Sequence, residues 1–325
     1  MGEGLVRFAL SGLANGLAQA ENSLRMASFR LYWTLARPFT LIPPMVGIFS
    51  GTLIAYSATR APLNPLALAL AVCGAAALNA GSNGLNQIFD LANDRINKPG
   101  RPLPAGRITL RQAWFFSCFS YAAALAMAAA VNAQTFGLFF LGAVATVLYS
   151  APPVRLKRRP WSSNLVIALA RGELLKVAGW AVVSTVLDSV EPWYIGLIFF
   201  FFLAGATTTK DFADVEGDRA AGCMTLPVKY GVAATARLIS PFFVLPWVVM
   251  AAGVWLKILS GNGPAILALS GLLTAWGVYV IFLINRDPHR LAQEGENHPG
   301  WRHMYGMMMV GHLGLAAAYL LRLAS

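Results

Sequence analysis

The sequence predicts an all-α membrane protein, a bundle of about nine transmembrane helices. Three observations lead to this fold class. Hydrophobic residues make up 57% of the 325 residues and charged residues only 12%, whereas about 25% of a soluble domain is charged. Apolar segments of about 20 residues recur along the chain, which is the length that a helix needs to cross a bilayer. Basic residues gather in every second connecting loop.

The predicted spans follow one another with short connections, so residues 38–325 are expected to form a single transmembrane domain. The third and fourth spans almost touch, and the fourth is short. Pro43, Pro44, Pro241 and Pro246 fall inside spans, where neighbouring helices must satisfy the backbone groups that the prolines free. The predicted spans lie near residues 39–58, 65–88, 112–131, 135–151, 161–187, 191–209, 233–256, 264–284 and 303–323.

The 25 Lys and Arg residues are unevenly distributed. Most lie in the N-terminal segment and in the loops after spans two, four, six and eight. A net charge of +11 would raise the question of nucleic acid in a soluble protein, but here the positive-inside rule accounts for it. We therefore expect no nucleic-acid partner. We expect residues 1–37 to form a cytoplasmic amphipathic arm on the bilayer surface, with the basic loops on the cytoplasmic side of a bacterial plasma membrane.

A first acidic motif follows the second span. Asn86, Asp90 and Asp94 are spaced i, i+4, i+8, which places three oxygen-bearing side chains on one face of a helix that ends at Pro99. Carboxylates stacked in this way repel one another, so the helix gains nothing from them by itself. A divalent cation on that face would explain the pattern.

A second acidic motif follows the sixth span, on the same side of the membrane. Asp211, Asp214 and Asp218 are spaced i, i+3, i+7, again one helical face. Mg²⁺ prefers carboxylate oxygens and commonly completes its shell with substrate phosphate. Solvated carboxylates that merely balance the basic loops are the alternative, but ionisable groups in membrane proteins usually have a function. Two acidic sets with flanking Lys and Arg predict a site for a metal-bridged diphosphate.

These residues also carry a family resemblance that covers nearly the whole chain. It resembles the UbiA-type intramembrane prenyltransferases in three stretches. The run from Asn86 to Gly106 is similar to their NDxxDxxxD motif and its NKPxRPxPxG continuation. Lys210 to Asp218 is similar to KDxxDxEGD and is followed by a TLPVxxG stretch, and Tyr149 to Pro153 with Lys157 is similar to YSxP…K. One departure is Gln87, where most members have Asp.

The resemblance implies roles for residues at the matching positions, around a central cavity that opens to the cytoplasmic side and laterally to lipid. Mg²⁺ and its diphosphate would be bound by Asn86, Asp90, Asp94, Asp211, Asp214 and Asp218. Four of these, Asp90, Asp94, Asp214 and Asp218, are the candidate catalytic residues. Substrate-binding candidates are Asn86, Lys98, Arg101, Tyr149, Lys157 and Lys210.

The implied activity is Mg²⁺-dependent transfer of an isoprenyl group from a polyprenyl diphosphate, for example geranylgeranyl or longer. The acceptor would be lipophilic or aromatic: a quinone precursor, a chlorin or a glycerol ether lipid. A terpene cyclase with the same metal site is an alternative, because the cation could be captured internally. An ion-coupled transporter is a third, but transporter sites lie near the bilayer midplane, whereas these motifs lie at span ends.

The fifth predicted span contains three charged residues, Arg171, Glu173 and Lys176. Glu173 and Lys176 are spaced i, i+3 and can pair with each other, which would make them structural. Charges at this depth usually face a cavity, so Arg171 is a further candidate for substrate binding, to the acceptor or to the diphosphate.

Overall fold

The computed structural model describes residues 29–220, 222–294 and 298–324, and within these ranges all regular structure is helical. Eight described helical segments are long and apolar enough to cross a membrane. The predicted all-α membrane fold is confirmed. The eight segments are η1 (Pro38–Leu41) with α2 (Ile42–Thr59), α3 (Pro65–Phe89), α5 (Leu110–Val131), α6 (Ala133–Ser150), α9 (Glu191–Ala206) with η4 (Thr207–Lys210), α12 (Val232–Ile239) with η5 (Ser240–Phe243) and α13 (Leu245–Trp255), α14 (Gly263–Arg286) and α16 (Pro299–Ala324).

The remaining predicted span, near residues 161–187, is a continuous but irregular helical path. It consists of α7 (Pro160–Ile167), the π-helical segment η3 (Ala168–Glu173) and α8 (Leu174–Ala181). The path is shorter than predicted, because residues 182–190 form turns and bends before α9 begins. A π-helical turn inside an α-helix is rare and is often found at functional sites. Here it contains Arg171, one of the candidate substrate-binding residues.

The third and fourth spans meet at a single residue, as their spacing predicted. α5 ends at Val131 and α6 begins at Ala133. Asn132 between them satisfies both helix ends: its backbone N–H donates to the carbonyl of Ala128, and its side chain accepts from the backbone N–H of Thr135 at 2.8 Å. The span at 232–255 is interrupted near its two prolines, because proline lacks the N–H that an α-helix needs.

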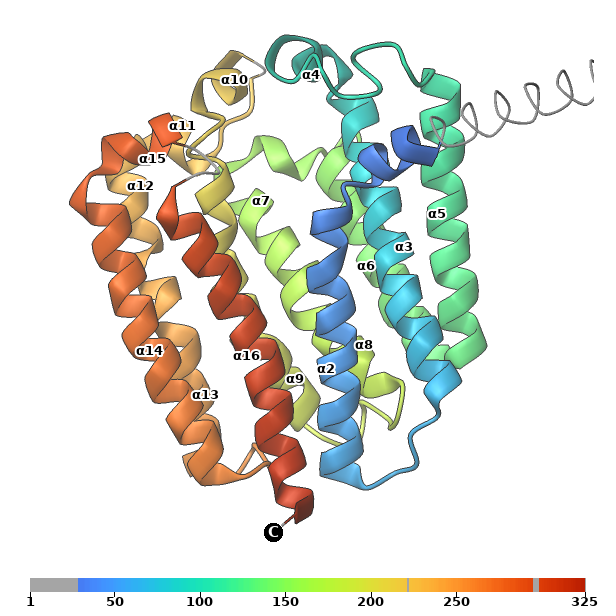
Figure 1. The fold of residues 1–325 in the computed structure, drawn as a ribbon, viewed down its shortest axis with the longest axis vertical. Coiled ribbons are helices and arrows are strands. Elements are labelled where there is room, and N and C mark those ends of the chain that lie inside the picture. The colour runs from blue at the N-terminus through green and yellow to red at the C-terminus, as the bar shows by residue number, and fades with distance from the viewer. Residues whose placement is uncertain (1–28, 221, 295–297, 325) are drawn as a thin grey trace, which may run out of the picture.

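Close helix crossings around α8 rest on glycines. A Cβ on Gly179 would lie 2.7 Å from the carbonyl oxygen of Ile48 on α2, and one on Gly172 would lie 2.7 Å from the backbone nitrogen of Phe200 on α9. Thr52 adds a hydrogen bond to the carbonyl of Gly179 at 2.9 Å. Small residues let membrane helices approach until their backbones touch, so α8 is held between α2 and α9 (Figure 1).

The outer surface of the bundle is apolar. Phe115 and Phe119 on α5 are 72% and 63% exposed, and Phe282 on α14 is 55% exposed. A soluble protein rarely leaves such large apolar patches in water, whereas lipid is a suitable solvent for them. The chain is therefore an integral membrane protein.

Short helices cover one end of the bundle, at the top of Figure 1, while turns and short loops connect the helices at the other end. The loops after α3, α9 and α14 lie at the covered end, as does the start of α7. The basic loops predicted to share a side thus lie together. The short helices are α4 (Leu91–Asn97), α10 (Val215–Ala220), α11 (Leu226–Tyr230) and α15 (Pro288–Glu294), and the 3₁₀ helix η2 (Leu156–Arg158) precedes α7.

Most of the predicted amphipathic arm, residues 1–28, lies outside the described residues. Residues 29–36 are helical, and three amides at successive turns of α3 anchor the end of this helix and the residues just after it. Asn79, Asn83 and Gln87 donate to the carbonyl oxygens of Thr40, Ala36 and Leu35 at 2.9, 2.8 and 2.8 Å. Two of these carbonyls belong to the last turn of the helix, where no partner is available within the helix itself.

This amide ladder (Asn79, Asn83 and Gln87) gives Gln87 a structural role. Gln87→Leu should leave the buried carbonyl of Leu35 without its donor, which costs about 1–3 kcal/mol, and should loosen the segment that carries Arg37. We expect a lower unfolding temperature in detergent, with Gln293→Leu, an exposed position on α15, as the matched control. Equal unfolding temperatures for the two variants would contradict the anchoring role.

Candidate active site

The first acidic motif spans a break between two helices. α3 ends at Phe89, Asp90 adopts a turn conformation with φ −99° and ψ 6°, and α4 begins at Leu91. The prediction of one continuous helical face was therefore wrong in detail. The i, i+4 hydrogen bond nevertheless persists across the break, from the backbone N–H of Asp94 to the carbonyl of Asp90 at 2.7 Å, and Asn86, Asp90 and Asp94 line the same cavity.

The second acidic motif is also less regular than predicted. The 3₁₀ helix η4 ends at Lys210, residues 211–214 form turns and bends, and α10 begins at Val215. Asp211, Asp214 and Asp218 thus do not share one helix. A short loop nevertheless brings the three carboxylates to the same cavity. Within it, the backbone N–H of Asp218 donates to the carbonyl of Asp214 at 2.7 Å.

Both motifs line one cavity of about 140 Å³, here called the acidic cavity. Every sequence-predicted site residue except Arg171 contributes to its wall. The two acidic motifs, which are separated by more than 100 residues in the sequence, thus face one another across the same cavity, as predicted. The described lining residues are Arg37, Asn86, Asp90, Asn93, Asp94, Lys98, Arg101, Tyr149, Lys157, Ser163, Lys210, Asp211, Asp214, Asp218, Cys223 and Thr225.

Basic side chains alternate with the carboxylates of the acidic cavity. Asp90 accepts from Arg155 at 2.9 Å and from Lys157, and Arg101 pairs with Asp94 at 2.6 Å. Lys98, from the loop after the first motif, pairs with Asp214 of the second at 3.2 Å. This last ion pair joins the two motifs directly. Such cations are suitable donors for phosphate oxygens, and the carboxylates are suitable ligands for a hard metal ion.

Two carboxylates of the second motif have strongly perturbed acidity. Burial raises the pKa of Asp211 to about 7, and the neighbouring carboxylates Asp218 and Asp214 add to this rise while Lys210 opposes it. Burial also raises the pKa of Asp218 to about 6, with a further contribution from Asp214. Near neutral pH this part of the cavity thus favours an additional positive charge, either a proton or a metal cation.

The donor set fits Mg²⁺ shared with a phosphate group. Within the described residues, no three His, Cys, Asp or Glu side chains converge closely enough to bind one ion together. Mg²⁺ commonly binds through one or two carboxylates and completes its octahedron with water and phosphate oxygens. Paired carboxylates from two motifs, with cations beside them, suit that mode better than a closed protein cage.

Sequence reasoning missed several residues of the acidic cavity. Arg37 and Thr225 line the cavity although nothing in the sequence assigned them a role there. Arg155 is not a lining residue, but it is ion-paired with Asp90, which is. Gln87 lies outside the cavity, with 2% of its surface exposed, because it anchors the N-terminal segment instead. A charge count cannot tell a topological arginine from one that lines a site, since only the fold decides which way it points.

The charged residues of the fifth predicted span are separated from one another. Glu173 and Lys176, which the sequence would allow to pair, do not form an ion pair: the buried Nζ of Lys176 donates to Ser50 Oγ at 2.6 Å and lies 4.6 Å from the centre of the Phe199 ring. Glu173 instead packs against Gly196 of α9. An i, i+3 pair presumes α-helical geometry, and the π-helical turn of η3 changes the direction of the side chains.

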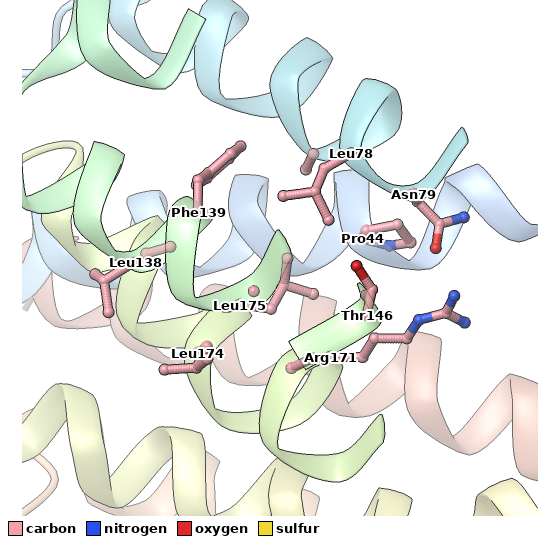
Figure 2. A pocket seen from close by; sticks show the side chains of 13 residues that line it. Pro44, Leu78, Asn79, Leu138, Phe139, Thr146, Arg171, Leu174 and Leu175 are labelled. Atoms are coloured by element: carbon pink, nitrogen blue, oxygen red, sulfur yellow. The ribbon is translucent and has the colours of Figure 1, made fainter. Parts of the chain in front are cut away.

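Arg171 lies outside the acidic cavity and lines three neighbouring ones. We call these the arginine cavity, the α16 arm and the α6 arm, with volumes of about 210, 150 and 50 Å³. The arginine cavity shares Arg37, Asn86, Tyr149 and Lys210 with the acidic cavity. The two arms are mainly apolar: the α16 arm runs between α2, α9 and α16, and the α6 arm between α2, α3, α6 and α8 (Figure 2).

Comparison with known proteins agrees with this geometry. Residues 45–295 match the UbiA prenyltransferase family. The chain belongs to this family. It is 32% identical over 255 residues to digeranylgeranylglyceryl phosphate synthase of Methanopyrus kandleri, covering 76% of this chain and 90% of that protein. It is also 32% identical to the bacteriochlorophyll synthase 33 kDa chain of Cereibacter sphaeroides, over 63% of this chain and 67% of that one.

Solved structures of the family share the fold. A UbiA homolog from Archaeoglobus fulgidus bound to GPP and Mg²⁺ superposes with a TM-score of 0.70 at 23% identity, over 91% of this chain and all of the other. The UbiA member described here is accordingly an intramembrane prenyltransferase. The predicted family and enzyme class are confirmed.

Proposed function

We propose that this UbiA protein transfers an isoprenyl group from a polyprenyl diphosphate to a lipophilic or aromatic acceptor in a Mg²⁺-dependent reaction. The observation that carries the proposal is the acidic cavity, in which Lys98 of the first motif is ion-paired with Asp214 of the second at 3.2 Å. A diphosphate that enters this cavity meets carboxylates for its metal and cations for its oxygens from both halves of the chain.

Ionisation of the donor needs two kinds of side chain, cations for the phosphate oxygens and carboxylates for the metal. Lys98, Arg101 and Lys157 are the donors to phosphate oxygens, and Asp90, Asp94, Asp211, Asp214 and Asp218 provide the carboxylates. When bound, Mg²⁺ supplies positive charge that stabilises the diphosphate as the bond to the allylic carbon breaks. The electron pair of that bond leaves with the diphosphate. The acceptor atom then bonds to the allylic carbon, and its proton passes to the released diphosphate.

The apolar arms supply walls for the isoprenyl chain. The α16 arm is lined in part by Leu175, Leu203, Met304 and Met308, and the α6 arm by Leu78, Leu138, Phe139 and Leu174. Both arms approach the polar cavities at Arg171. An allylic diphosphate can therefore have its head among the carboxylates and its tail in an apolar environment that excludes water from the reactive carbon.

The test uses the purified full chain in detergent with radiolabelled geranylgeranyl diphosphate, Mg²⁺ and a panel of acceptors. Mg²⁺-dependent diphosphate release that disappears in Asp214→Ala supports the proposed ionisation, and a labelled acceptor identifies transfer. A labelled hydrocarbon formed without acceptor would instead identify a terpene cyclase. A folded protein that releases no diphosphate from geranylgeranyl diphosphate, or from shorter and longer polyprenyl diphosphates, would contradict the proposed ionisation.

The raised pKa values predict how Mg²⁺ binding depends on pH. Protonated carboxylates do not bind metal, so affinity should be nearly full at pH 8 and should fall as the pH drops through the pKa values of Asp211 and Asp218, about 7 and about 6. Between pH 8 and pH 6 we expect about a 20-fold loss if both must be ionised. Equilibrium Mg²⁺ titration measures it, and Asp211→Asn should flatten the dependence. A loss that begins only below pH 5 would contradict the assignment.

We further propose that residues 38–325 act as one catalytic domain, with the N-terminus, the basic loops and the mouth of the acidic cavity on the cytoplasmic side. The positive-inside rule supports this orientation, because the basic loops lie together at the end of the bundle that bears the acidic motifs. Labelling of single cysteines introduced at Arg60 and at Arg219 in sealed membranes would test it, since the two positions should differ in accessibility.

A further inference from the structure

The α16 arm has a polar group at its inner end. One face of α16 lines the arm, from Trp301 beside the arginine cavity, past Met308, to His312. Eleven residues separate Trp301 from His312, which corresponds to about 16 Å along the helix axis. His312 lies near the middle of α16, so the arm ends deep within the bundle.

His312 is buried but lacks a hydrogen-bond partner. It is 1% exposed, and among the described residues its Nδ1 atom has no hydrogen-bond partner. A polar group that is taken out of water without a partner destabilises the fold, and an ionisable residue inside a membrane usually serves a function. The imidazole therefore favours a partner that the chain itself does not supply.

Neighbouring helices hold the imidazole in place. Its ring is stacked on that of Phe199 on α9, with the ring centres 4.1 Å apart and the planes 9° apart. On the other side lies Gly47 of α2, where a Cβ would be 3.9 Å from Cε1 of His312. A side chain that is already ordered loses little freedom when it binds a ligand.

The surroundings of His312 favour a neutral ligand group. Lys176, which lies on the same Phe199 ring, donates to Ser50 Oγ and does not serve the imidazole. No Asp or Glu is among the described residues that line the α16 arm, so an ammonium group would find no counter-charge there. An ion of either sign is costly to bring to this depth. A hydroxyl or carbonyl oxygen satisfies an imidazole nitrogen without that cost.

The α6 arm has a different inner end. Its wall away from Arg171 is formed by Leu138 and Leu174 (Figure 2), so a plain hydrocarbon tail is surrounded by apolar side chains. In the α16 arm the same tail would reach His312 and leave its nitrogen unpaired. The two arms therefore suit different molecules, a hydrocarbon in the α6 arm and an oxygen-bearing lipid in the α16 arm.

We propose that His312 forms a hydrogen bond with a neutral oxygen, a hydroxyl or a carbonyl, at the distal end of the lipid that occupies the α16 arm. This role rests on the proposed prenyl transfer, to which it adds a residue that determines specificity. The ligand is polar at both ends: one end lies at the arginine cavity and the other about 16 Å away, at His312. Two molecules reach the arm, the tail of the isoprenoid donor and the body of the acceptor, and two series of probes distinguish them.

The first series tests the donor. Geranyl, farnesyl and geranylgeranyl thiolodiphosphates, whose bridging sulfur resists ionisation, are compared with analogues hydroxylated at the terminal methyl group. Competition against radiolabelled geranylgeranyl thiolodiphosphate with Mg²⁺ gives each dissociation constant for the full chain in lipid nanodiscs. The hydroxylated analogue of one length should bind about 10-fold more tightly than its parent, because only that length places the oxygen at His312.

The second series tests the acceptor. With geranylgeranyl thiolodiphosphate and Mg²⁺ already bound, tritiated α,ω-alkanediols are compared with 1-alkanols of the same length, and binding is counted above that of empty nanodiscs. When the acceptor is the molecule that occupies the α16 arm, a diol of matching length should bind about 10-fold more tightly than the alkanol. When the donor occupies it, the preference appears in the first series alone.

His312→Leu should abolish the preference for oxygen in whichever series shows it. The hydrocarbon parents should bind to this variant at least as tightly as to the wild-type chain, which also shows that the variant is folded. His312→Gln keeps a hydrogen-bonding amide and should retain part of the preference. His289→Leu, at an exposed histidine of α15, is the matched control and should behave as the wild-type chain does.

Two results would overturn the role of His312 and leave the proposed function intact. The first is a wild-type chain that binds the thiolodiphosphates but shows no preference for oxygen in either series, and it does not depend on whether a variant folds. The second is a preference that persists in His312→Leu, since another residue would then bind the oxygen. A chain that binds none of the thiolodiphosphates would contradict the proposed function itself, and the role of His312 with it.

Discussion

Replacing Asp90 with alanine is expected to lower the rate of Mg²⁺-dependent prenyl transfer by about 10³-fold. Removing one preorganised donor to a developing anion typically costs about 10²- to 10³-fold, and Asp90 is proposed to position more than one such group. It is a proposed metal ligand, and it is the shared partner of Arg155 and Lys157. Without it, two cations that should approach the diphosphate in a defined geometry lose their common anchor.

The measurement is single-turnover release of labelled diphosphate, which isolates ionisation from later steps. Asp90→Glu keeps the charge and should recover part of the rate. Asp188→Ala is the matched control, because Asp188 is an exposed aspartate in the turns between α8 and α9, at the end of the bundle opposite the acidic motifs (Figure 1). A folded Asp90→Ala enzyme within tenfold of the wild-type rate would contradict the metal-site assignment.

Gly172→Ala is expected to lower both the stability of the bundle and the rate of prenyl transfer. The new Cβ would lie 2.7 Å from the nitrogen of Phe200 and 2.8 Å from the carbonyl carbon and oxygen of Phe199. These are backbone atoms that no rotamer change can move, so η3 and α9 must separate. Overpacking of this kind typically costs about 1–3 kcal/mol. Because Arg171 precedes the glycine, transfer should fall together with stability.

Thermal unfolding in detergent and prenyl transfer would both be measured for this variant. Gly271→Ala provides the control, since this glycine of α14 has open space where a Cβ would lie. Alanine is the better helix former by about 1 kcal/mol, so the control should be neutral or slightly stabilised. If the two variants behaved alike, the close crossing of η3 and α9 would not be important for stability.

The sequence was sufficient to predict what depends on composition and spacing. Apolar segments of bilayer length indicated the helices. The third and fourth predicted spans almost touched, and in the structure Asn132 alone separates α5 from α6. The convergence of the two acidic motifs could be predicted because both follow spans that end on the same side of the membrane. The i, i+4 spacing of Asn86, Asp90 and Asp94 remained informative even though the helix breaks at Asp90.

Features that depend on tertiary packing could not be predicted in the same way. The π-helical turn of η3 has no periodic signature, so the sequence left open a Glu173–Lys176 pair of the kind that an α-helix would allow. Arg37 and Arg155 contributed to the charge count of basic loops, and only the folded chain shows that one lines the acidic cavity and the other pairs with Asp90. The role of Gln87 needed the position of the N-terminal segment.

The glycine-mediated crossings of α8 with α2 and of η3 with α9 have a consequence for how this enzyme can diversify. Where backbones touch, the spacing between helices is fixed by atoms common to every residue, so substitutions elsewhere in the bundle do not readily shift it. Side chains that line the two arms are attached to this fixed frame and can be exchanged one at a time. Substitutions in the two arms should therefore change the preferred isoprenoid length and the preferred acceptor shape independently, without altering the helix packing.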